Sequence, residues 1–130
     1  MAELHENPEV FRFILEEIDS VPHLEALLLL WHNRAQPWAV PGVAKRLYVN
    51  PDTARQLLLD LHRRHLIATV PGSTELYRFD AGSPEKDRLI GEVDATYRRE
   101  LVRISTMIHS KASTAVREFA KAFRITKERE

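Results

Sequence analysis

The chain has 130 residues, of which 44% are hydrophobic and 29% are charged, and 19 basic residues balance 19 acidic ones. This length supports one compact core but not two full-sized domains, and the absence of cysteine excludes a disulfide framework and any thiolate site. The longest wholly apolar run, Ala26–Trp31, is far shorter than the roughly 20 residues that span a bilayer. The amino terminus has no apolar signal segment, so the sequence predicts a cytoplasmic protein without a membrane partner.

Charge is distributed unevenly along the chain. Residues 1–25 contain seven acids and one base, residues 26–83 contain seven bases and four acids, and residues 84–130 contain eleven bases and eight acids. The amino-terminal region is therefore acidic and the remainder mildly basic, which permits contacts with phosphate groups but does not require them.

Two helices are expected before residue 33. An amphipathic helix is predicted at about Pro8–Ile18, with an apolar face formed by Val10, Phe11, Ile14, Leu15 and Ile18. Ser20 is a good N-cap for the second helix, whose run Leu24–Trp31 is apolar nearly all round. That pattern is typical of a helix in the middle of a core.

The next segment predicts two helices and a hairpin. A helix over Ala39–Leu47 and a turn at residues 48–50 precede a helix over Pro51–Arg64, which Asn50 can cap. His65 occupies the position where the chain would turn through the left-handed region. Strands are expected at Leu66–Val70 and Glu75–Asp80. The buried stripe of the helix at 51–64 leaves the following residues pointing mostly outward: Thr53, Arg55, Gln56, Leu59, Asp60 and Arg63.

The last third predicts a long helix and a short one. Ser83 and Pro84 can start a helix that continues to about His109, and a further helix is expected at Ser113–Phe123. The long helix has an apolar stripe with a mean spacing close to 3.6 residues, formed by Ile90, Val93, Tyr97, Leu101, Ile104 and Ile108. Packing within the chain would explain this stripe, but a straight helix of this length exceeds a small domain, so we expect part of it to contact a second subunit.

Residues 20–80 resemble the winged-helix domains of bacterial transcriptional regulators, particularly the MarR-like and PadR-like groups. The resemblance rests on the pattern of Leu24–Trp31, Val43–Val49, Ala54–Leu61, Leu66-Ile67 and Leu76–Phe79. It implies a mainly α fold with a small β-hairpin, in which a winged helix-turn-helix is followed by a long helix and a short terminal helix. The implied regions are an amphipathic helix at 1–19, the winged domain at 20–80 and a helical dimerisation region at 81–130.

Two functional hypotheses follow. The first is a homodimeric transcriptional regulator that reads the major groove of double-stranded DNA with helix 51–64, using Thr53, Arg55 and Gln56 on base edges. The other expected DNA-binding residues are Lys45, Arg46, Arg63, Ser73, Thr74 and Arg78. The alternative is a winged helix that binds a protein partner, docking through the acidic first helix or the face Val116–Phe123, without sequence-specific DNA binding.

Catalysis, cofactors and metals have little support in the sequence. No glycine-rich phosphate loop, zinc-protease motif or nucleophile elbow occurs, so we expect no enzyme activity and no cofactor. His62 and His65 share helical spacing but have no cysteine or carboxylate cluster nearby. An effector pocket lined by Trp31, Trp38, Tyr77 and Tyr97 is a further hypothesis, although aromatic residues at such spacing are more often part of a core.

Overall fold

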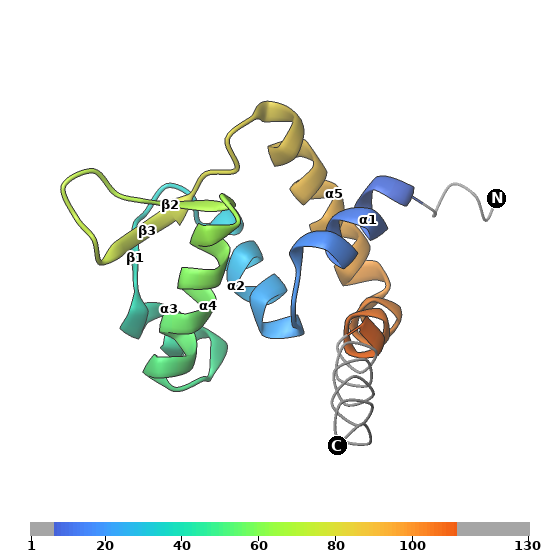
Figure 1. Cartoon of the computed structure of the whole chain (residues 1–130), viewed down its shortest axis with the longest axis horizontal. Helices are drawn as coiled ribbons and strands as arrows, with labels where there is room; N and C mark the ends of the chain where they lie inside the picture. Colours follow the sequence, from blue (N-terminus) through green and yellow to red (C-terminus); the bar gives the residue numbers. More distant parts are fainter. Residues whose placement is uncertain (1–6, 112–130) are drawn as a thin grey trace, which may run out of the picture.

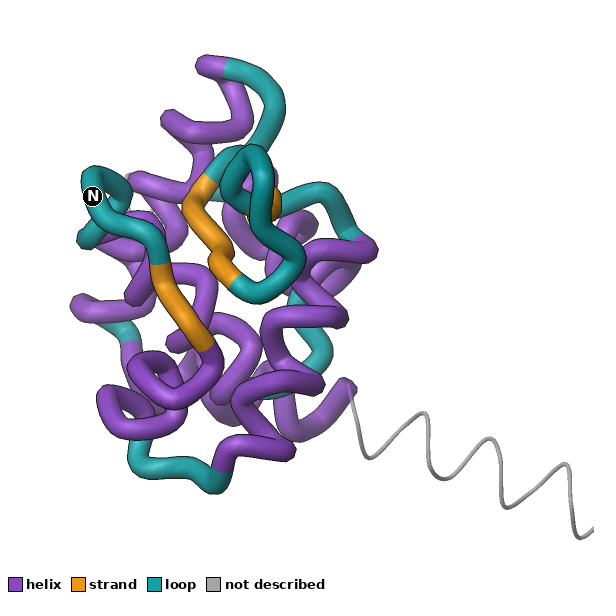
Figure 2. The backbone as a smooth tube through the Cα atoms, turned by 90° about the vertical axis from the view of Figure 1, so that its left-hand side faces the viewer, coloured by secondary structure: helices purple, strands orange, loops and turns teal. Residues whose placement is uncertain are grey.

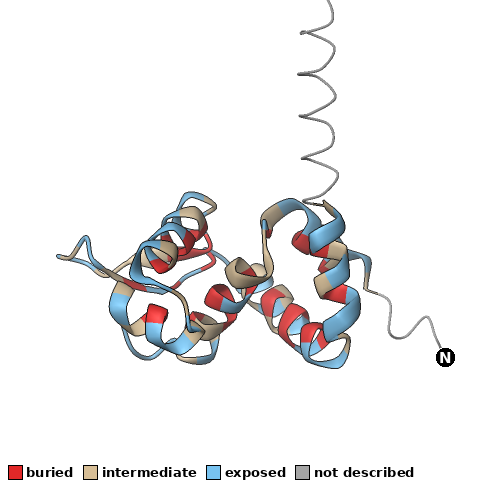
Figure 3. Cartoon of the chain, turned by 90° about the horizontal axis from the view of Figure 1, so that it is seen from below, coloured by how far each residue is buried: buried red, intermediate tan, exposed pale blue. Residues whose placement is uncertain are grey.

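A computed structural model of the protein describes residues 7–111, which form two lobes joined by a central helix (Figure 1). In one lobe α1 (Pro8–Glu17) packs against α5 (Pro84–Arg99). The other lobe contains α3 (Val40–Leu47), α4 (Pro51–Arg63) and the sheet, and α2 (Val21–His32) lies between the lobes. Buried residues line the inward faces of both lobes (Figure 3).

The central helix behaves as its sequence predicts. Leu24, Leu27 and Leu30 of α2 are fully buried, and α2 contacts α3, α4 and β3. Because its apolar residues surround the helix axis, α2 can contribute to the cores of both lobes at once.

Four helices of the described part of the chain begin with a side-chain cap and have proline at the first or second helical position. The caps are Asn7, Ser20, Asn50 and Ser83, and each side chain accepts a hydrogen bond from a backbone N–H in the first turn. Such a cap satisfies a donor that the helix itself leaves unpaired. The predicted helix starts at Ser20, Asn50 and Ser83 are thereby confirmed.

The sheet has three antiparallel strands in the order β1-β3-β2 (Figure 2). The hairpin strands, β2 (Ile67–Thr69) and β3 (Leu76–Phe79), are shorter than predicted, and β1 (Trp38–Ala39) was not expected. The prediction that Ala39 begins a helix was therefore wrong. Ala39 pairs with Leu76, and Trp38 buries its ring opposite Tyr77, so cross-strand pairing delays the helix until Val40.

Within residues 7–111, two residues other than glycine have left-handed backbone conformations. His65 has φ 61°, which confirms its predicted position after α4, and Tyr48 has φ 57° at the end of α3. Tyr48 lets the chain turn from α3 into α4, and His65 lets it turn from α4 into β2; in both cases the two elements contact each other.

The predicted helix from Pro84 to about His109 is not continuous. Its regular conformation ends at Glu100 (φ −127°, ψ 51°), and a second helical stretch follows over residues 101–111. Leu101, directly after this break, is 52% exposed, whereas Ile104 and Ile108 in the same helical stretch are fully buried. The helix predicted at Ser113–Phe123 lies outside the described residues.

The apolar face of α1 also differs from its prediction. Val10 and Ile14 are buried as expected and Phe11 is half-buried, but Phe13 is buried and Leu15 is 44% exposed. The predicted face was therefore wrong at Leu15, because α5 covers the neighbouring side of the helix. Among residues 7–111, no helix combines the length and the apolar character needed to cross a membrane.

Candidate nucleic-acid interface

The outer face of α4 is fixed by the residues that it buries. Ala54, Leu57, Leu58 and Leu61 are buried against α2 and α3, as predicted. Arg55 and Gln56 are consequently exposed, and Thr53 is half-buried with its N–H bound to the Asn50 side chain at 2.8 Å. The amino-terminal half of α4 therefore presents Arg55 and Gln56 to solvent.

A hollow of about 380 Å³ lies between α4 and the hairpin. Arg55 and Leu59 line it from α4, and Thr74, Glu75 and Tyr77 line it from the hairpin. Two predicted DNA-binding residues from distant parts of the sequence, Arg55 and Thr74, thus meet at one surface. Arg55 also pairs with Asp52 on its own helix, with Nη1 3.1 Å from the carboxylate.

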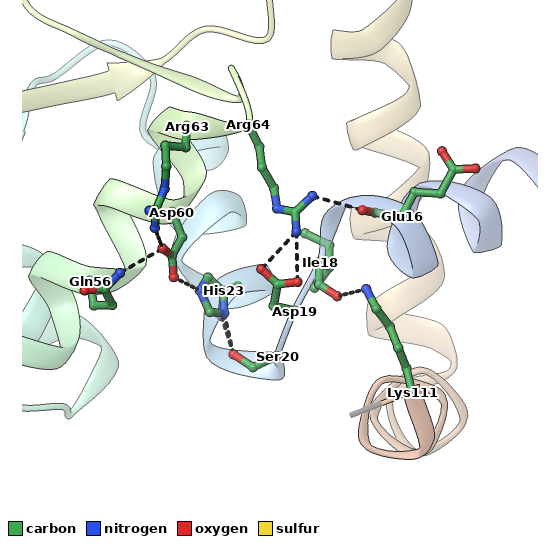
Figure 4. Close-up of polar contacts among 10 residues, drawn as sticks. All are labelled: Glu16, Ile18, Asp19, Ser20, His23, Gln56, Asp60, Arg63, Arg64 and Lys111. Atoms are coloured by element: carbon green, nitrogen blue, oxygen red, sulfur yellow. Dashed lines mark hydrogen bonds and ion pairs between the residues drawn. The ribbon is translucent and has the colours of Figure 1, made fainter. Parts of the chain in front are cut away.

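The second half of α4 is organised around Asp60 (Figure 4). One carboxylate oxygen accepts hydrogen bonds from Gln56, at 2.8 Å, and from Arg63, and the other lies 2.7 Å from His23 Nε2. The prediction that Asp60 points outward was wrong: its side chain is only 18% exposed because it faces the start of α2.

These contacts set the protonation of Asp60. Burial raises the pKa of the carboxyl, but the hydrogen bonds from His23, Gln56 and Arg63 together outweigh burial and leave the pKa below its ordinary value. Asp60 is therefore ionised at neutral pH. Its charge offsets that of Arg63 in the free protein.

The carboxyl end of α4 is bound to the segment between α1 and α2 (Figure 4). Arg64 donates to both Asp19 carboxylate oxygens, at 2.9 and 3.1 Å, and to the Glu16 carbonyl at 3.0 Å. On the other side of this segment, Lys111 donates to the Ile18 carbonyl at 2.8 Å. The Glu16–Asp19 segment therefore connects α4 with the helical stretch 101–111.

The remaining predicted DNA-binding residues do not all share one surface. Lys45 and Arg46 are exposed on α3, and Arg46 lies over the Trp38 ring at 5.5 Å. Ser73 lies in the hairpin turn, where its Oγ accepts from the Glu75 N–H at 3.1 Å. Arg78 borders a separate hollow with Pro37 and Val70.

Arg63 is also separated from the hollow beside Arg55. It borders a third hollow with Asp19, Asp60 and Arg64, next to the segment between α1 and α2. The structure thus brings Arg55 together with Thr74 but places Arg63 and Arg78 around other depressions.

Most of the predicted dimerisation stripe is covered within the chain. The buried residues are Ile90, Val93, Tyr97, Ile104 and Ile108, whereas Leu101 is 52% exposed. The adjacent Val102 is 77% exposed. An interface in this region would therefore use Leu101 and Val102 and not the whole stripe.

The four aromatic residues of the effector hypothesis have structural contacts. Trp38 and Tyr77 are paired in the sheet. Trp31 donates from Nε1 to Asp87 at 2.9 Å, and the Tyr97 hydroxyl donates to Glu25 at 3.3 Å. These contacts account for the four side chains without a ligand.

Sequence reasoning missed two features of this surface. Leu59 points outward as predicted and is 42% exposed, but its position in a hollow beside the hairpin depends on how the hairpin folds. The link between Asp60 and His23 spans 37 residues, and no local pattern reports it. The one available signal for this link was Asp60 itself, an acidic residue on a helix face otherwise rich in Arg and Gln.

Two helices joined by a tight turn, preceded by β1 and followed by the hairpin β2–β3 that completes a three-stranded sheet, define a winged helix-turn-helix. Neither a protein-family model nor a curated protein matches the sequence. The structure is similar to a crystal structure of RV1404 from Mycobacterium tuberculosis, with a TM-score of 0.51 and 18% identity, covering 93% of this chain and 83% of that one.

It is also similar to a mutant of MepR from a multidrug-resistant clinical isolate of S. aureus. That comparison has a TM-score of 0.51 and 14% identity, and covers 97% of this chain and 92% of the other. Both neighbours are winged-helix proteins, so the predicted fold is confirmed. At these identities the similarity concerns the fold.

Proposed function

We propose that the protein is a DNA-binding transcriptional regulator that inserts α4 into the major groove. The observation that carries this proposal is the exposure of Arg55 and Gln56 on the amino-terminal half of a capped second helix in a helix-turn-helix. In this fold the amino-terminal residues of the second helix contact base edges. Arg suits guanine and Gln suits adenine, because each can form two hydrogen bonds with that base.

The other cations have a supporting role in this proposal. Lys45 and Arg46 on α3 and Arg63 on α4 would contact phosphates, together with Ser73, Thr74 and Arg78 from the hairpin. Phosphate contacts fix the register of a protein on DNA but carry no direct sequence information. Since Arg63 and Arg78 border separate hollows, they would reach different stretches of the backbone from Arg55.

The test is DNA binding over a salt series with Arg55→Ala and a matched control. Arg99→Ala is the control, because Arg99 is also exposed but lies on α5. We expect Arg55→Ala to weaken binding to selected DNA about 5- to 100-fold, the usual effect of losing a base-contacting arginine. Arg99→Ala should leave the affinity unchanged. An unmodified protein that does not bind DNA at low salt would contradict the proposal.

A second function, binding to a protein partner, is favoured by one observation. Both arginines of α4 are paired with carboxylates of the same helix: Arg55 with Asp52, and Arg63 with Asp60. The whole chain also has no net charge. If DNA binding is absent at every salt concentration, the surface around Leu59 and Arg55 would be the docking region to examine.

We also propose that the functional unit is a homodimer. Leu101 and Val102 are adjacent, exposed and apolar, and they lie where the helical stretch 101–111 begins. Covering them in a second subunit would remove apolar surface from water. Two α4 helices in such a dimer would meet half-sites about one helical turn apart.

A further inference from the structure

Tyr48 is an exposed aromatic residue in a backbone conformation that tyrosine disfavours. It lies in the turn between α3 and α4 with φ 57° and ψ 43°, in the left-handed region. Its side chain is 94% exposed. It forms no side-chain hydrogen bond or ring contact with any residue in the described range.

The turn requires this conformation, but it does not require tyrosine. The Val49 N–H donates to the Ala44 carbonyl at 3.1 Å, which closes the end of α3 and directs the chain into α4. Glycine reaches the left-handed region without a steric penalty, whereas a bulky side chain incurs one. Because the ring is almost wholly in water, burial does not offset that penalty. Folding stability therefore does not explain this residue.

The position of Tyr48 relates it to the surface proposed for DNA. It is two residues before Asn50, the cap of α4, and three residues after the exposed Lys45. It therefore lies beside the amino terminus of α4, the end that enters the groove in the proposed function. A tyrosine hydroxyl is among the side-chain groups that donate to phosphate oxygens.

We propose that Tyr48 is a DNA-contacting residue whose hydroxyl donates a hydrogen bond to a backbone phosphate next to the α4 amino terminus. This inference rests on the proposed DNA-binding function. The role of Tyr48 is to position α4 on the duplex, since a phosphate contact adds affinity and fixes the register without reading a base.

His65 provides a matched control within the same chain. It is the other described residue besides glycine with a positive φ, at 61°, and it is also exposed. It follows the opposite, carboxyl-terminal end of α4. Replacing either residue with glycine relieves the same kind of backbone strain, but only Tyr48 lies beside the end of α4 proposed to enter the groove.

The experiment compares Tyr48→Gly, Tyr48→Phe and His65→Gly in the full chain. Affinity is measured by fluorescence anisotropy on DNA selected from a random pool by the unmodified protein, and folding by thermal melting. We expect both glycine variants to melt at the same temperature as the unmodified protein or about 2–5 °C higher. Tyr48→Phe should weaken DNA binding about three- to tenfold and Tyr48→Gly at least as much, whereas His65→Gly should not.

A salt series distinguishes this contact from a cationic one. Tyrosine is neutral and releases no counterion, so the slope of log affinity against log salt should be unchanged in Tyr48→Phe, whereas Lys45→Ala should reduce it by about one. DNA binding by Tyr48→Gly equal to that of the unmodified protein would overturn this inference alone. Failure of the unmodified protein to bind DNA would overturn the proposed function and this inference with it.

Discussion

Asp87 shows at the scale of one residue how this chain holds two helices together. Its carboxylate, on α5, accepts hydrogen bonds from Arg34 at 2.7 and 2.9 Å and from Trp31 Nε1 at 2.9 Å. Arg34 itself lies 5.5 Å from the Trp31 ring and 5.0 Å from the Phe79 ring. A single carboxylate therefore joins α5 to the end of α2 and, through Arg34, to the sheet.

These hydrogen bonds make stability depend on pH. The bonds from Arg34 and Trp31 lower the pKa of Asp87 from 3.8 to about 2, although burial opposes the change. Because the folded-state pKa is below the unfolded value, the ionised carboxylate stabilises the fold above pH 4. That contribution is lost as the pH falls from 3.8 towards 2.

We predict that Asp87→Asn lowers the free energy of unfolding by about 1 kcal/mol near pH 6, allowing for solvent screening of a side chain that is partly exposed. The difference between variant and unmodified protein should shrink as the pH approaches 2. Urea unfolding at pH 6, 4 and 2.5 measures it. A difference that is constant over this range would contradict the assigned pKa.

At the scale of the element, α4 shows how one helix serves two purposes. Leu58 is fully buried, whereas its sequence neighbour Leu59 is 42% exposed. Adjacent residues of a helix point in different directions, so Leu58 and Leu59 lie on different sides of α4. The buried side packs against α2 and α3, and the outer side is available to a partner. Stability and binding can therefore be altered independently on this helix.

We predict that Leu58→Ala lowers the free energy of unfolding by about 2–4 kcal/mol, because it removes buried methyl groups and leaves a cavity. Leu59→Ala should cost less than about 1 kcal/mol, since its side chain is largely in contact with water. Chemical denaturation of the two variants measures both free energies of unfolding. Equal losses would mean that Leu59 is more deeply packed than its exposure indicates.

At the scale of the whole molecule, the acidic segment between α1 and α2 links the two lobes. Arg64 reaches it from α4 and Lys111 reaches it from the helical stretch 101–111. Burial lowers the pKa of Lys111, with Asp19 and Glu17 opposing that shift. The orientation of α4 is thus tied to the region that we propose forms the dimer.

We predict that Leu101→Glu combined with Val102→Glu converts the dimer to a monomer, because two like charges would face each other across a symmetric interface. Leu15→Glu is the control: Leu15 is 44% exposed and lies on α1. Light scattering should give twice the mass of one chain for the unmodified protein and the control, and one chain mass for the double variant. A monomeric unmodified protein would refute the dimer.

Local sequence signals determined the helices, their starts and the order of the elements. Asn50, Ser83 and His65 act through backbone groups a few residues away, and the apolar spacing of α2 and α4 reports which side is buried. These interactions are short in sequence. The sequence therefore predicted the winged helix-turn-helix and the outward direction of Arg55 and Gln56.

The tertiary structure decided which of those outward residues meet and which are already bound. Ala39 is a strand residue because it pairs with Leu76, and the Asp60 side chain points inward because its carboxylate contacts His23. The predicted single helix is interrupted at Glu100, and beside this break Leu101 is exposed while Ile104 is buried, so the surface available for a second subunit differs from the predicted stripe. Each outcome depends on residues at least 37 positions apart or on a change of helix direction, and local spacing contains no information about either.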